Sequence, residues 1–127
     1  MKKPEDTRYG EIAINALNLI HKNKYTPEKA WDNAVKGYEK GCPKSAFLGL
    51  CNQGYILNVV NNKKEEITDN GRYAITAADI IFLYPNTTYT ASKLWKAVGE
   101  KTARPETHNG QMHVVLALKE RDYLQKN

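Results

Sequence analysis

The chain has 127 residues, of which 41% are hydrophobic and 26% charged, a composition typical of one globular domain and not of a disordered chain. No apolar run approaches the roughly 20 residues that a membrane-spanning helix needs, and the polar start does not resemble a signal peptide, so we expect a cytoplasmic protein without a membrane partner. The net charge of +5 permits nucleic-acid binding, but basic and acidic residues alternate, which is typical of a solvated surface.

Three helices are predicted in the first half of the chain. Residues 8–22 carry apolar side chains at helical spacing on one face. Thr26 and Pro27 begin a second helix, because threonine caps helix starts and proline is tolerated in the first turn. A third helix covers residues 43–53 and ends at Gly54. It is the most apolar of the predicted helices, so we expect it at the centre of the first core and more buried than any other helix.

Residues 55–68 leave two alternatives open. Tyr55 begins a stretch rich in strand formers, and residues 61–64 are a plausible turn. The segment is therefore expected to form either a small β-hairpin or an ordered loop.

Three more helices are predicted in the second half. One covers residues 72–84 and is ended by Pro85, and Thr90 caps the next. The last runs from about 108 to 122. No linker divides the chain, so we predict an all-α fold with residues 1–127 in a single domain.

The two halves resemble one unit written twice. Eight pairs of identical residues share a spacing of 64 positions: Arg8/Arg72, Tyr9/Tyr73, Ala13/Ala77, Leu19/Leu83, Tyr25/Tyr89, Thr26/Thr90, Lys29/Lys93 and Trp31/Trp95. A shift of four more positions aligns residues 48–56 with 116–124. We therefore predict pseudo-repeated three-helix units over residues 8–56 and 72–124, with Trp31 and Trp95 buried at equivalent sites. The alternative is two ordinary sets of amphipathic helices that share helix-forming patterns.

The two cysteines have different predicted environments. Cys42 lies at the expected start of the third helix, where free amide groups and the helix dipole favour a thiolate. The simpler interpretation is a small capping residue. Cys51 is expected to be a buried core thiol. Nine residues of helix separate their sulfurs by roughly 13 Å, so we expect no disulfide.

His108, Asn109 and His113 lie around the start of the last predicted helix, at the counterpart of the Cys42 region. If the two units pack about a pseudo-twofold axis, the two helix starts face each other. Cys42, His108 and Asn109 would then form a candidate Cys-His-Asn catalytic set with Cys42 as the nucleophile. The alternative is that Asn109 caps the helix and both histidines are polar surface residues.

Metal ions and cofactors are not expected. The cysteines do not form a C-x-x-C pair, and His108 and His113 are five positions apart rather than four. No glycine-rich phosphate loop precedes a helix.

Nucleic-acid binding remains open. Three helices followed by a possible hairpin resemble a winged helix-turn-helix arrangement, but the third helix is apolar at its centre and offers little to a DNA groove. Lys93, Lys96, Lys101 and Arg104 are better candidates for phosphate contacts. A solvated surface is the simpler interpretation of these four residues.

Two strings carry a resemblance to a known family: GCPxxAFLGLC at residues 41–51 and HNxQMxVVLAL at residues 108–118. They resemble a family of small uncharacterised bacterial proteins of unknown function. The resemblance covers most of the chain and departs at residues 57–70. It implies a shared bacterial fold and no activity, cofactor or catalytic residue.

Two classes of function follow from the sequence. The first is a non-catalytic binding or adaptor protein that acts on protein or nucleic acid, and it is the one we favour. The second is a small thiol-dependent enzyme that uses Cys42 with His108.

Overall fold

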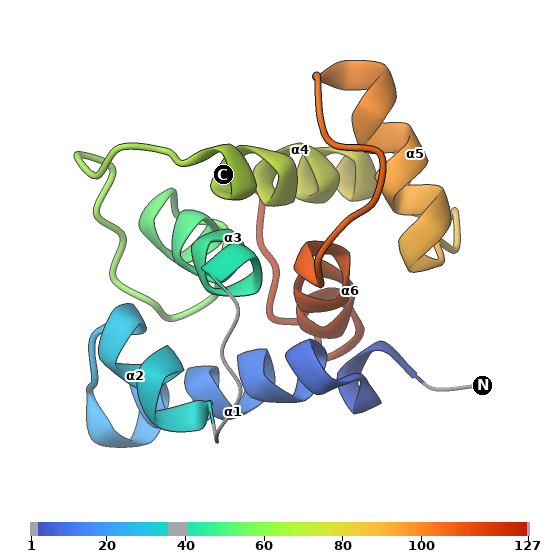
Figure 1. Ribbon diagram of the computed structural model, residues 1–127. Helices are drawn as coiled ribbons and strands as arrows, with labels where there is room; N and C mark the ends of the chain where they lie inside the picture. Colours follow the sequence, from blue (N-terminus) through green and yellow to red (C-terminus); the bar gives the residue numbers. More distant parts are fainter. Residues whose placement is uncertain (1–2, 36–40, 127) are drawn as a thin grey trace.

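The computed structural model describes residues 3–35 and 41–126, and its regular secondary structure is entirely helical (Figure 1). A short 3-10 helix and six α-helices follow one another in this part of the chain: η1 (Pro4–Asp6), α1 (Arg8–Asn23), α2 (Pro27–Ala34), α3 (Gly41–Asn52), α4 (Asp69–Leu83), α5 (Ala91–Lys101) and α6 (Gln111–Glu120). The all-α prediction is confirmed. None of these helices is long and apolar enough to cross a membrane.

Threonine side chains start four of the helices. Thr7, Thr26, Thr68 and Thr90 each accept a hydrogen bond from the backbone amide three residues later, at 3.0–3.3 Å. This bond satisfies an amide that the helix itself leaves without a partner. The caps at Thr26 and Thr90 were predicted. The start of α4 was predicted too late, because Thr68 begins the helix at Asp69 rather than near residue 72.

Helices α3 and α6 end in the same way. The amides of Tyr55 and Tyr123 each bond the carbonyl five residues earlier, both at 2.9 Å. Gly54 and Asp122 precede them with φ of 84° and 58°, the left-handed conformation that such a helix ending requires. The predicted termination at Gly54 is confirmed.

The hairpin alternative for residues 55–68 is wrong, and the loop alternative holds within the described residues. Ile56 forms an isolated antiparallel bridge with Leu124 instead of pairing locally. The amide of Asn62 bonds the carbonyl of Asn52 at 2.9 Å and ties the loop to the end of α3. The strand-forming residues in this segment pair with the far end of the chain. The local sequence pattern cannot reveal a partner that is so distant in sequence.

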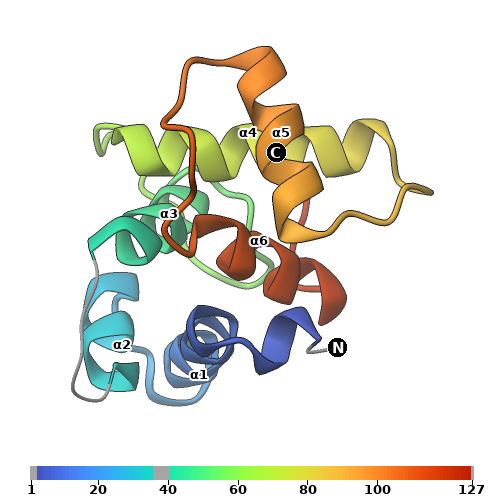
Figure 2. The ribbon, with the colours of Figure 1, turned by 45° about the vertical axis from the view of Figure 1, so that its right-hand side comes forward.

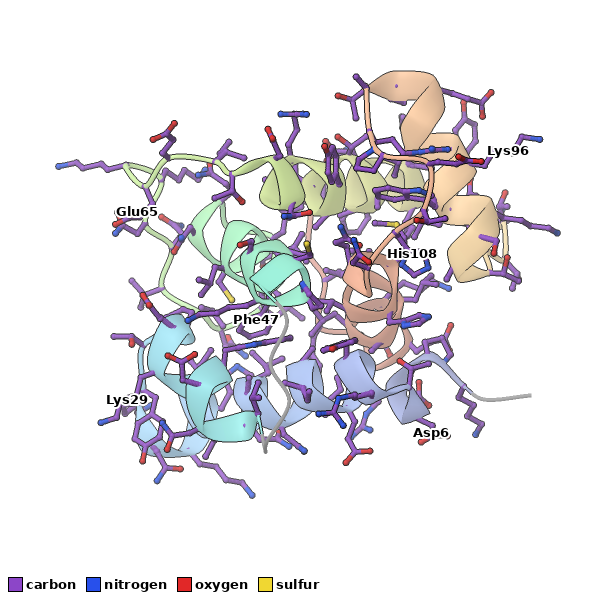
Figure 3. The ribbon with its side chains drawn as sticks, viewed as in Figure 1. Asp6, Lys29, Phe47, Glu65, Lys96 and His108 are labelled. Atoms are coloured by element: carbon purple, nitrogen blue, oxygen red, sulfur yellow. The ribbon has the colours of Figure 1, made fainter. Side chains whose placement is uncertain are left out.

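Helices α3 and α6 lie between α1 and α4 (Figures 1 and 2). Helix α3 packs chiefly on α4, and α6 packs chiefly on α1 and η1. The most buried helix is α6 and not α3 as predicted, because every side chain of residues 114–118 is buried. Figure 3 shows Phe47 inside the fold, whereas Glu65 and Lys96 lie at its edge.

Two close helix crossings hold this arrangement. A Cβ atom on Gly49 would lie 2.6 Å from the Cα of Gly71, so α3 and α4 touch backbone to backbone. A Cβ atom on Gly10 would lie 3.0 Å from the Cβ of Ala117, where α1 meets α6. Small residues at both crossings therefore set the separation of the helices.

Both tryptophans are buried, as predicted, with exposed fractions of 0% for Trp31 and 4% for Trp95. Trp95 meets Tyr73 of the preceding helix edge to face, with ring centroids 5.4 Å apart. Trp31 instead has its described ring contact with Phe47 of the following helix, at 5.2 Å. Their packing environments therefore differ in part.

Candidate functional site

The two thiols lie on one helix in different environments, and neither forms a disulfide. Cys42 is half-buried in the first turn of α3, one position inside the helix rather than at its cap. Cys51 is 1% exposed, and burial raises the pKa of its thiol because a thiolate would lose its hydration. The prediction that Cys51 is a core thiol is confirmed.

His108 lies between α5 and α6 (Figure 3). Its Nδ1 accepts a hydrogen bond from the Gly110 amide at 3.2 Å. Its ring contacts Trp95 and His113, with centroids 5.9 Å and 5.1 Å away. These contacts orient the imidazole within the α5–α6 connection.

Asn109 is exposed and does not cap α6, because the helix begins two residues later, after Gly110 with φ of 96°. The Asn109 amide donates to the side-chain oxygen of Gln111. Gln111 is buried, and its Nε2 donates to Oδ1 of Asn70 on α4 at 2.8 Å. A buried glutamine thus joins the start of α6 to α4, a role that the sequence pattern did not indicate.

The starts of α3 and α6 meet. A Cβ atom on Gly110 would lie 3.0 Å from Cγ of Pro43 and 2.7 Å from the Tyr9 ring. This contact places the neighbourhoods of Cys42 and His108 in one region of the fold. Their direct pairing stays a prediction.

The predicted phosphate-binding residues divide into two groups. Lys93, Lys96 and Lys101 are exposed on α5. Arg104 donates from Nε to the Trp95 carbonyl at 3.0 Å, and its guanidinium lies over the Trp95 ring at 5.0 Å. Arg104 therefore fastens the α5–α6 connection to the core, which favours a structural role for it.

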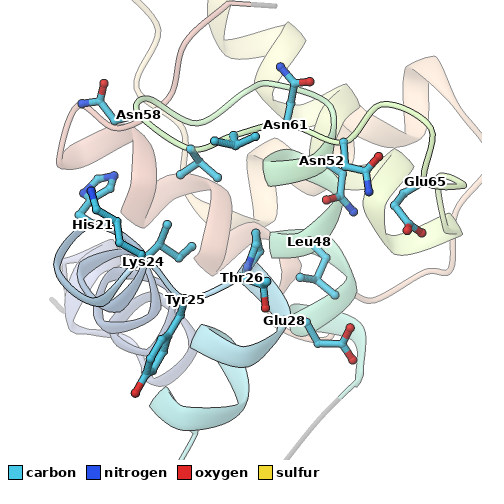
Figure 4. Close-up of a pocket in the computed structure, with 15 residues that line it drawn as sticks. His21, Lys24, Tyr25, Thr26, Glu28, Leu48, Asn52, Asn58, Asn61 and Glu65 are labelled. Atoms are coloured by element: carbon cyan, nitrogen blue, oxygen red, sulfur yellow. The ribbon is translucent and has the colours of Figure 1, made fainter.

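The described surface has a groove of about 1090 Å³ that the sequence did not predict (Figure 4). The end of α1, the start of α2, one side of α3 and residues 58–65 enclose it. Its apolar lining comes from Ile20, Leu48, Val59 and Val60. Its polar lining includes His21, Lys24, Glu28, Asn52, Asn58, Asn61 and Glu65.

The loop after α3 leaves apolar side chains in water, and of the two that follow only Val60 lines the groove. Val60 is 91% exposed and Leu57 is 37% exposed. The loop is held in place because the Leu57 carbonyl lies 3.3 Å from Nε2 of His21, whose ring contacts Tyr123. Val60 is therefore exposed on a loop that is held in place against α1.

A second apolar surface lies where α4 ends. Leu83 is 63% exposed and Tyr84 is 53% exposed. We call Leu83 and Tyr84 the corner patch. Figure 1 shows that the end of α4 lies beside α5, on the opposite side of the molecule from the loop that follows α3.

The described part of the chain is thus a small all-α protein with an open groove and a separate apolar corner, and it contains no cluster of three or more side chains suited to a metal ion. The chain belongs to DUF6979, a family of unknown function whose model matches residues 6–125. This match confirms the resemblance to a family of unknown function. No curated protein and no solved structure matches the chain.

Stability should fall on acidification in part because of His113. Burial lowers the pKa of this half-buried imidazole below its usual value of about 6.5, so the unfolded chain binds a proton more readily than the folded one. The resulting destabilisation is absent above the unfolded pKa and grows as the pH falls through the folded pKa. Urea unfolding at about pH 7 and pH 5 should show a smaller loss for His113→Gln than for the wild type. Equal losses would contradict this assignment.

Proposed function

We propose that the protein is a non-catalytic binding protein of the cytoplasm that contacts another polypeptide through the groove and the corner patch. One observation carries this proposal. The large exposed hydrophobic side chains of the described residues lie only in the loop after α3 and at the end of α4: Leu57, Val60, Ile67, Leu83 and Tyr84. Exposed apolar groups confined to two segments favour an interaction surface over a random scatter.

Two uncharged segments that carry most of these apolar groups favour a protein partner over nucleic acid. Residues 53–62 and 80–92 contain no charged side chain, although 26% of the whole chain is charged. Phosphate backbones are held by lysine and arginine, whereas the centres of protein interfaces are depleted of charge and enriched in tyrosine. The unbridged thiols of Cys42 and Cys51 fit the reducing conditions of the cytoplasm.

The proposal includes a duplicated architecture, supported by residues at matching places in α1 and α4. Their best alignment has a spacing of 61 positions: Thr7/Thr68, Gly10/Gly71, Ala13/Ala74, Ile14/Ile75, Ala16/Ala77 and Ile20/Ile81. The spacing is 64 at the caps of α2 and α5 and 68 at the ends of α3 and α6. Under this alignment the Arg8-Tyr9 and Arg72-Tyr73 pairs are out of register by about one helical turn.

Contacts between the halves support a pseudo-twofold relation. Ile56 pairs with Leu124, which is its own counterpart at the spacing of 68. The Gly49–Gly71 crossing corresponds to the crossing of Ala117 with Gly10, because Gly49 and Ala117 match at the spacing of 68 and Gly10 and Gly71 at the spacing of 61. Each unit thus packs its third helix on the first helix of the other unit.

Site-specific photo-crosslinking tests the proposed function. A benzophenone amino acid replaces Val60 or Leu83 in the full chain inside its native cells, and Lys96, exposed on α5, is the control position. We expect protein crosslinks from the first two positions and not from Lys96, and we expect the captured protein, once purified, to bind wild type more tightly than Val60→Asp. Crosslinks to nucleic acid, or no crosslink at either patch, would contradict the proposal.

A second candidate function is a small thiol-dependent enzyme that uses Cys42 and His108. The contact between Pro43 and Gly110 favours it, because it brings the starts of α3 and α6 together. Native alkylation with iodoacetamide should be faster at half-buried Cys42 than at Cys51, whose burial disfavours the thiolate. Because the binding proposal assigns no reaction to Cys42, His108→Ala should leave its rate unchanged within about twofold, a difference of only about 0.4 kcal/mol. A collapse of the Cys42 rate in that variant would favour the enzyme.

A further inference from the structure

We propose that the groove binds an extended segment of a different polypeptide that carries an acidic side chain at one end and a basic side chain at the other. This inference rests on the proposed function and specifies the chemistry of the partner at that site. The acidic end of the segment lies where α1 finishes. The basic end lies at the opposite end of the groove, beside carboxylates that pack against α3.

The two ends of the groove differ in charge. Figure 4 shows His21 and Lys24 together at the end of α1, and it shows Glu28 and Glu65 toward the opposite end. Lys24 is exposed and has no ion pair within the described residues. A ligand that is negative at one end and positive at the other therefore matches the groove. A uniformly charged chain such as a nucleic acid would meet like charges at one of the two ends.

The carboxylate of Glu28 is held against α3 by a shared lysine. Oε1 of Glu28 lies 3.6 Å from Nζ of Lys44, which also pairs with Oδ1 of Asp32 at 2.8 Å. One ammonium group thus faces two carboxylates. This cluster keeps a net negative charge at its end of the groove.

A second hollow continues the groove at the acidic end. It has a volume of about 120 Å³ and shares Asn52 and Glu65 with the groove. Glu66 adds a second carboxylate to its lining, whereas Lys63 and Lys64 do not line it. Its volume equals that of about four water molecules, which is room for one long side chain. A lysine or arginine of the partner therefore fits there, with its charge beside the two carboxylates.

Between its two ends the groove suits an uncharged, extended backbone. The side-chain amides of Asn52, Asn58 and Asn61 line it and form no hydrogen bond within the described part of the chain. Each amide offers both a donor and an acceptor. These are the groups that the free N–H and C=O of an extended segment require. The apolar lining described above accommodates a hydrophobic side chain at the centre of the segment.

Blocked synthetic peptides test the charge arrangement on the purified full chain. Each peptide has about eight residues, which span at most roughly 27 Å, with leucine and alanine at its centre. Two peptides carry glutamate at one end and lysine at the other, in the two possible orders, and two carry like charges at both ends. In titrations followed by backbone-amide NMR shifts, one mixed-charge order should bind with a Kd of about 0.1–1 mM. Both like-charged peptides should bind at least about threefold more weakly.

A charge exchange at Lys24 tests which end of the groove receives the acidic side chain. Lys24→Glu should weaken binding of the mixed-charge peptide at least about threefold and strengthen binding of the peptide with two lysines by a similar factor. Lys22→Glu is the matched control, because Lys22 is exposed on the same helix and does not line the groove. It should change either affinity by less than about twofold.

Lys24→Gly separates binding from stability. Lys24 ends α1 with φ of 59°, in the left-handed conformation that favours glycine. Glycine should therefore leave the melting temperature unchanged or raise it, while binding of the mixed-charge peptide weakens at least about threefold. Asp122→Gly is the control, because Asp122 has φ of 58° and does not line the groove. It should leave the affinity for the peptide unchanged.

Failure of this inference is distinct from failure of the binding function. Three results would each overturn the charge arrangement: no binding of either mixed-charge peptide at about 5 mM, equal affinities for mixed and like charges, or equal effects of Lys24→Glu and Lys22→Glu. If Val60 is crosslinked to a protein in cells and one of these results is obtained, the binding function stands and this inference falls. Crosslinks from Val60 only to a second copy of the chain would have the same meaning. If neither patch captures a protein, the proposed function itself fails.

Discussion

Replacement of Trp31 by alanine is expected to lower the free energy of unfolding by about 3–5 kcal/mol. The indole is fully buried and contacts the Phe47 ring in a tilted arrangement, so its removal leaves a cavity between α2 and α3 that the surrounding helices cannot fill. Trp95→Ala should lower the free energy of unfolding by a similar amount. The loss of this indole removes the hydrogen bonds that its Nε1 donates to the carbonyls of Pro105 and Glu106.

Urea denaturation followed by circular dichroism measures both losses. Lys96→Ala is the control, since Lys96 is exposed on the same helix as Trp95 and should change stability by less than about 0.5 kcal/mol. A loss below about 1 kcal/mol at Trp31 would be incompatible with its burial.

Gly49→Ala is expected to destabilise the fold by about 1–3 kcal/mol, and Gly49→Leu by more. The added Cβ would lie 2.6 Å from the Gly71 Cα, which is backbone and can yield only if α3 and α4 move apart. A side chain at this position therefore strains the central helix crossing.

Gly41→Ala supplies the matched control on the same helix. Among the described residues, no atom outside the adjacent helix backbone lies within 4 Å of the Cβ that it would add, so alanine should leave stability unchanged or raise it by up to about 1 kcal/mol. The melting temperature of Gly49→Ala should therefore fall below that of wild type, whereas that of Gly41→Ala should not. Equal shifts would show that helix propensity, and not the crossing, decides the effect.

Local chemistry in the sequence predicted the elements of the fold well. Thr26 and Thr90 cap helices, and Gly54 ends one, because each of these roles depends on a residue and its immediate neighbours. The start of α4 was missed because Thr68 stands before polar residues, where the apolar helical pattern has not yet begun.

Long-range contacts explain what the sequence could not reveal. Ile56 and Leu124 look like ordinary strand formers until their bridge is seen. Val60 also belongs to an apolar stretch, and nothing in its neighbours indicates that 91% of it is exposed beside a groove. The groove depends on how α1, α2 and α3 come together with the loop, so it has no local sequence signal.

The exchange of packing between the halves gives residues 57–67 a role as a covalent tether. Helix α3 packs chiefly on α4 and α6 packs chiefly on α1, so the core includes extensive contacts between helices on the two sides of this loop. Because this loop joins the two halves covalently, they associate within one molecule. Each half meets the other at an effective concentration on the order of millimolar. A chain cut within this exposed loop would have to assemble its core from two fragments, and its stability would then depend on dilution.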